Sequence, residues 1–145
     1  MRKLFFILCV SMMVFHVNIA QATEVTIKVT DIDVKRGGSI IVLIFDENGF
    51  PMAHKKALFS KSSNTLQETM MFTFNLSLEE MAVKVLHDED KNGKVTKNWT
   101  GIYPGEGLGF SKEQKVTMTG PPIYEESKLS RDEFINGLRI SLLYP

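Results

Sequence analysis

The sequence predicts an all-β domain, an antiparallel two-sheet sandwich of about seven strands over residues 23–145. Three observations favour this class. Apolar and polar residues alternate with a period of two in several segments, no long segment has the 3.6-residue period of a helix, and Gly, Pro and Asn clusters separate the segments at short intervals. The alternative is a small closed barrel, which is built from the same kind of strands.

Residues 1–22 have the features of a secretory signal peptide. Arg2 and Lys3 precede an apolar run over residues 4–17, and Ala20-Gln21-Ala22 supplies a small-x-small cleavage site. A membrane anchor would need roughly 20 apolar residues, and polar residues interrupt this run. We therefore expect an exported protein, periplasmic or secreted, with no stable membrane insertion after cleavage.

The charge of the chain excludes one class of partner. It has 17 basic and 17 acidic residues and no long basic run, so it lacks the electrostatic surface expected for nucleic-acid binding. Loss of Arg2 and Lys3 with the signal peptide leaves a slight excess of acidic residues. The expected partner is an unidentified ligand or an envelope protein.

Two strands are expected early in the mature chain. Residues 24–30 alternate as a half-buried strand does, and the unbroken apolar run within residues 39–46 favours a central strand covered on both faces. Residues 50–63 contain Pro51 and several lysines, which favours a loop with at most one helical turn.

The remaining expected strands follow the same reasoning. Residues 67–76 alternate, as do residues 81–87, where Val83, Val85 and His87 share one face. Three further strands are expected, separated by turn-forming residues. They are residues 94–99, 114–119 and 134–144.

The segment after the strand at 81–87 has the pattern of the first half of a calcium loop. Asp88, Asp90 and Asn92 place oxygen-bearing side chains at alternate positions, and Gly93 allows a sharp turn. The backbone carbonyl of Lys94 could add a fourth ligand. The pattern then departs from an EF-hand, because Trp99 stands where the bidentate Glu belongs, so the closing carboxylate has to come from elsewhere. Glu106 is the nearest downstream candidate.

The same segment also fits a hairpin without metal. Asn-Gly between two apolar strands is a strong signal for a tight turn, and acidic residues at turns are usually only solvated. The following residues, 101–111, contain four glycines and are expected to form a shaped loop without regular structure. This loop could present Trp99, Tyr103 and Phe110 to a ligand, or its aromatic side chains could close the end of the sandwich.

The chain resembles the exported bacterial proteins grouped as domain-of-unknown-function family 2141. The resemblance covers essentially the whole mature chain. The residues that carry it are His87-Asp88-Glu89, Asn92-Gly93-Lys94, Asn98, Gly101-Ile102, Gly109-Phe110-Ser111 and Gly120-Pro121-Pro122. It implies an immunoglobulin-like or transthyretin-like sandwich with no established activity. Thr96 departs from the family pattern, which has Asp there, and this removes a possible metal ligand.

The function expected from these observations is a non-catalytic exported module, with calcium as the candidate cofactor of the turn. A first alternative is a metal-dependent hydrolase using His87, Asp88 and Asp90. It lacks support from any nucleophile motif, because the mature chain has no Cys and no Gly-x-Ser-x-Gly. A second alternative, a small-molecule carrier, requires a sizeable apolar pocket.

Overall fold

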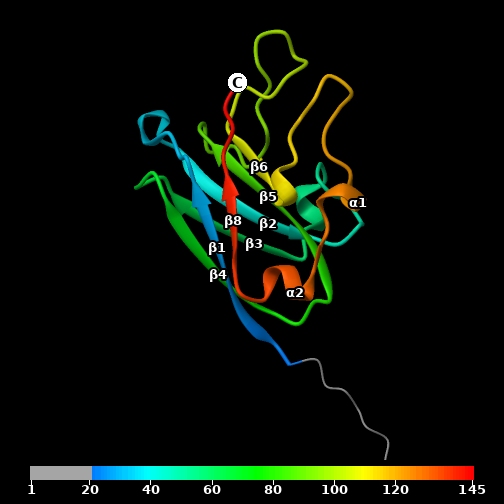
Figure 1. The fold of residues 1–145 in the computed structure, drawn as a ribbon. Helices are drawn as coiled ribbons and strands as arrows, with labels where there is room; N and C mark the ends of the chain where they lie inside the picture. The colour runs from blue at the N-terminus through cyan, green and yellow to red at the C-terminus, as the bar shows by residue number, and fades with distance from the viewer. Residues whose placement is uncertain (1–20) are drawn as a thin grey trace, which may run out of the picture.

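The computed structural model describes residues 21–145 (Figure 1). The predicted signal peptide therefore lies outside the described residues, apart from its last two. The eight strands are β1 (Thr23–Thr30), β2 (Ser39–Phe45), β3 (Phe59–Asn64), β4 (Met70–Leu76), β5 (Glu80–Asp88), β6 (Leu108–Phe110), β7 (Leu129–Ser130) and β8 (Leu138–Ser141). Two short helices, α1 (Tyr124–Ser127) and α2 (Arg131–Phe134), and three 3-10 turns at 34–36, 54–56 and 111–113 complete the domain.

The strands form two sheets, which confirms the predicted all-β sandwich. One sheet has the order β4-β1-β8, and the other has the order β3-β2-β5-β6, with β7 paired to β5. All pairs are antiparallel except β1 with β8. Figure 1 shows the reason for the exception: α2 brings the chain back to the end of the sandwich where β1 begins, so β8 leaves in the same direction as β1.

The main core lies between the two sheets. The period-two residues of β1, Val25, Ile27 and Val29, are completely buried there, as the alternation predicts. The strands β2 and β5 are buried along both faces. On the outer face of the larger sheet, a second apolar cluster forms around Leu86, Leu108 and Phe110. Segments that follow β5 and β6 therefore cover this sheet, and the candidate sites lie within this cover.

Four sequence-based predictions of local structure were wrong or only partly right. Residues 59–63, expected in the loop 50–63, form most of β3, because an edge strand can be polar when only part of it is covered. Residues 94–99 and 114–119, expected as strands, contribute only isolated bridges, Lys97 to Pro104 and Thr117 to Gly120. They lie over the sheet instead of joining it. The strand expected at 134–144 is shortened to β8.

The glycine-rich segment also differs from the prediction, because it contains the short strand β6. Gly109 pairs with Val85 of β5. A Cβ atom at Gly109 would lie 2.7 Å from the carbonyl oxygen of Ser141, so glycine is required where the end of β8 passes over β6. The glycines of this segment predicted irregular structure, yet Gly109 is the residue that allows the strand β6 to form here.

Candidate metal centre

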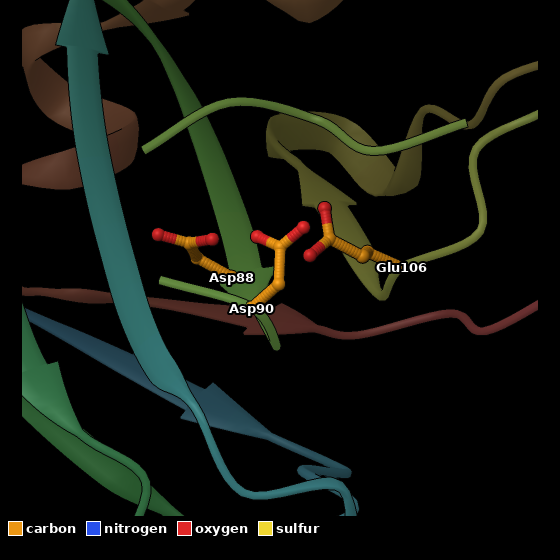
Figure 2. Close-up of side chains that lie close together, drawn as sticks. All are labelled: Asp88, Asp90 and Glu106. Atoms are coloured by element: carbon orange, nitrogen blue, oxygen red, sulfur yellow. The ribbon is translucent and has the colours of Figure 1, made fainter. Parts of the chain in front are cut away.

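Three carboxylates gather at the end of β5. Asp88 is the last residue of this strand, Asp90 lies in the turn that follows, and Glu106 precedes β6. One oxygen atom from each lies within 4.8 Å of the others. Figure 2 shows Asp90 and Glu106 reaching toward each other from these separate segments. Asp88 and Glu106 are buried, whereas Asp90 is exposed.

The position of Asp88 follows from the strand before it. Successive side chains of a strand point to opposite faces, so His87 and Asp88 lie on opposite sides of the larger sheet. Gly38, just before β2, has a φ of 70° and packs directly on the backbone of Asp88, where a Cβ atom would clash with the carbonyl oxygen. The start of β2 thus holds the end of β5 in place.

The carboxylates of Asp88 and Asp90 organise the turn. Asp88 accepts hydrogen bonds from the backbone N–H groups of Asn92, at 3.0 Å, and Gly93, at 2.8 Å. Asp90 accepts from the Asn92 backbone at 3.1 Å, from the Asn92 amide at 2.7 Å and from the Thr96 hydroxyl at 2.8 Å. The Thr96 hydroxyl is the largest of the interactions that lower the pKa of Asp90.

Glu106 joins the turn to the segment before β6. Its carboxylate accepts the backbone N–H of Glu89 at 2.9 Å and that of Thr96 at 2.7 Å. Burial raises the pKa of Glu106, and the negative charges of Asp90 and Asp88 raise it further, against the effect of the two N–H donors. Glu106 is therefore a partly desolvated carboxylate that lies beside the carboxylates of Asp88 and Asp90.

The negative charge of this cluster has no basic partner within the described residues. None of the ion pairs found in residues 21–145 includes Asp88, Asp90 or Glu106. All the hydrogen bonds found on these carboxylates come from neutral groups. Oδ2 of Asp90 accepts two hydrogen bonds, but the other five oxygens of the three carboxylates accept one each, which leaves each of these five a lone pair for a cation. Three carboxylates without a counter-charge are a suitable ligand set for a divalent ion that prefers oxygen.

Three of the five predicted ligands, Asp88, Asp90 and Glu106, bring carboxylate oxygens within 4.8 Å of one another. The side-chain oxygen of Asn92 accepts the backbone N–H of Lys94 at 2.7 Å, and its amide donates to Asp90 and Thr96. Asn92 therefore shapes the turn through its hydrogen bonds, and the backbone N–H of Lys94 joins this network through Asn92. Thr96 stands where the family pattern has Asp, a possible metal ligand. It connects Asp90 with Glu106 instead, because its hydroxyl donates to Asp90 and its backbone N–H donates to Glu106.

His87 lies apart from the three carboxylates. Its ring is completely buried, and Nε2 is 2.6 Å from the Gly37 carbonyl oxygen and 3.2 Å from the Thr65 hydroxyl. Donation by Nε2 to the carbonyl leaves Nδ1 to accept from the Tyr144 hydroxyl at 2.7 Å. Both ring nitrogens are thus occupied by groups of the core. The structure does not bring this ring beside Asp88 and Asp90 as a free base.

Sequence reasoning missed a second polar feature, the buried Lys84 of β5. It is 2% exposed and lies on the same face of the sheet as Asp88. The signal was a single lysine within the otherwise apolar run from Met81 to Leu86. His54, in the loop before β3, links the two features, because its ring lies 2.8 Å from the Lys84 ammonium and 3.2 Å from the Gly93 carbonyl oxygen.

Comparison with known proteins agrees with the resemblance noted from the motifs. The model of the family described as uncharacterized proteins conserved in bacteria, DUF2141, matches residues 27–134. No curated protein and no solved structure matches the chain. Within residues 21–145, no helix is long and apolar enough to cross a membrane.

Proposed function

Because the chain belongs to the bacterial family DUF2141, whose description assigns no activity, we propose its function from the site: an exported, non-catalytic module of the cell envelope whose acidic turn binds calcium. The module acts in the periplasm or the medium, where it contacts a ligand or another envelope protein. The calcium ion is a structural brace in this proposal.

The observation that carries the proposal is the uncompensated cluster of Asp88, Asp90 and Glu106, whose oxygen atoms lie within 4.8 Å of one another. Calcium takes six to eight oxygen ligands in flexible geometry, and water completes sites that have few protein ligands. A bound ion would remove the repulsion among the three charges. It would also tie the end of β5 to the segment before β6, and so hold the layer that covers the larger sheet.

The non-catalytic part of the proposal rests on His87. A metal-dependent hydrolase built on His87, Asp88 and Asp90 needs a base that can reach an activated water or a substrate. The His87 ring is completely buried and hydrogen-bonded on both nitrogens. This arrangement supports a role in the core.

Calcium is expected to stabilise the purified protein saturably. For an affinity of about 0.1 to 1 mM, typical of extracellular modules, 5 mM calcium raises the free energy of unfolding by about 1 to 2 kcal/mol. In a domain of this size that corresponds to a rise in Tm of about 3 to 8 °C. Thermal unfolding in EDTA and across a calcium titration measures the effect.

A pair of variants tests whether the cluster is responsible. Asp90→Asn should lose most of the calcium-dependent shift, because it removes one of the three charges. Asp46→Asn is the matched control, since Asp46 accepts a hydrogen bond from the backbone of Asn48 just as Asp90 does from Asn92, but lies outside the cluster. An unchanged Tm at 5 mM calcium, or equal shifts in both variants, would contradict the proposal.

A further inference from the structure

A cavity of about 250 Å³ opens on the covered face of the larger sheet. Lys84 of β5 and Leu108 and Phe110 of β6 contribute to its wall, together with residues from three loops, at 51–52, 95–104 and 116–121. Most of the lining side chains are apolar. Among the described residues that line it, none is acidic and two are lysines, Lys84 and Lys97. The cavity therefore combines an apolar surface with positive charge.

Lys84 is an unusual residue to find in such a wall. It is 2% exposed and donates to the Pro51 carbonyl oxygen and to Nε2 of His54, both at 2.8 Å. An ammonium has three N–H donors, so these two bonds leave one for another acceptor. In residues 21–145, no carboxylate pairs with it. A buried charge without a counter-ion is costly, and an anion in the cavity would compensate it.

The rim of the cavity carries exposed apolar side chains. Ile102 is 73% exposed, Met118 is 91% exposed and Met52 is 65% exposed, and all three line the cavity. Single exposed apolar residues need no explanation, whereas three that line the same cavity provide the kind of apolar surface that ligand-binding sites have. The three come from different loops, so only the folded chain brings them together.

We propose that this cavity binds a small organic carboxylate, whose charged group accepts the free N–H of Lys84 and whose apolar part lies against Leu108 and Phe110. The volume of the cavity limits the size of the ligand. It exceeds the cavity of about 150 Å³ that holds benzene and falls just short of the roughly 300 Å³ at which drug-sized sites begin. One ring or a short alkyl chain fits this volume. The site goes beyond the calcium brace and does not depend on it.

Binding of phenylacetate and of its neutral analogue phenylacetamide, measured by calorimetry, tests the proposal. Phenylacetate is expected to bind saturably with a Kd in the millimolar range or tighter, and phenylacetamide at least about tenfold more weakly. Lys84→Met should weaken phenylacetate binding by at least about tenfold. Lys28→Met, which removes an exposed lysine of β1 on the other sheet, should leave it unchanged. Equal affinity for acid and amide, equal affinity of wild type and Lys84→Met, or no binding of the acid at about 20 mM, would overturn the proposal.

A second pair of variants tests the proposed anion site even if Lys84→Met fails to fold. Ile102→Glu places a negative charge at the rim and should weaken phenylacetate binding by at least about threefold, whereas Ile102→Gln should retain it. Equal binding by the two would count against an anion site. The same titrations in EDTA separate this site from the brace: binding should persist without calcium, and binding that requires calcium would place the anion on a metal and overturn the role of Lys84.

Discussion

Replacing His87 by Ala is expected to lower the free energy of unfolding by about 3 to 5 kcal/mol. The substitution empties a completely buried site and leaves the Gly37 carbonyl oxygen and the Tyr144 hydroxyl without their ring partner. Urea unfolding measures the loss. A hydrolytic role for this histidine predicts the opposite result, a variant that is inactive but about as stable as the wild type.

Tyr144→Phe provides a graded control for the same network. The Tyr144 hydroxyl accepts the backbone N–H of Asp33 at 2.9 Å and bonds Nδ1 of His87, so its removal should cost about 1 to 2 kcal/mol. The double variant should cost less than the sum of the two single ones, because each removes a shared interaction. Additive losses would show that the two side chains stabilise the core independently.

The second large effect concerns pH and Lys84. Between pH 7 and about 10.5, the wild type is expected to gain about 3 kcal/mol of unfolding free energy relative to Lys84→Met. Burial lowers the pKa of Lys84 from its ordinary value near 10.5 to about 8. Each tenfold change in proton affinity corresponds to about 1.4 kcal/mol, which sets the size of the effect.

The sign follows from proton binding. Between these two pKa values the unfolded chain holds a proton on Lys84 that the folded chain has released, so stability rises with pH. The burial penalty is therefore full below pH 8 and is lost by pH 10.5. Urea unfolding of both proteins at several pH values measures the difference, with Lys28→Met as the control for loss of one positive charge. A difference that stays constant with pH would contradict the buried ammonium.

One side chain, that of His54, lies between the two candidate sites. It contacts the Lys84 ammonium through Nε2 and the carbonyl oxygen of Gly93, in the acidic turn, through Nδ1. Burial is the main cause of its lowered pKa, and the nearby charge of Lys84 adds to it. This contact connects the turn that would hold calcium with the wall of the cavity.

Much of the sandwich could be read from the sequence, because its strands bury one face and so alternate. This reasoning located β1 and β4, and the continuous apolar run of β2 predicted a strand covered on both faces. The alternation in residues 81–87 also located β5, although this strand is buried along both faces. The turn from Asp88 to Gly93 was also accessible, since its hydrogen bonds join residues only a few positions apart. The family itself could be identified from its motifs, and the match over residues 27–134 confirms it.

Other features depend on contacts between distant segments, which local patterns do not record. The strand β3 is polar because it lies at the edge of its sheet. Residues 94–99 have alternating apolar and polar side chains, but they pair with no strand and form only an isolated bridge. The spacing of Asp90 and Glu106 in the sequence does not predict that their side chains meet. They meet because the segments that cover the larger sheet fold back on one another. The same cover buries Lys84 and encloses the cavity beside it. Periodicity reports which face of a strand is buried, and only the tertiary structure shows what covers it.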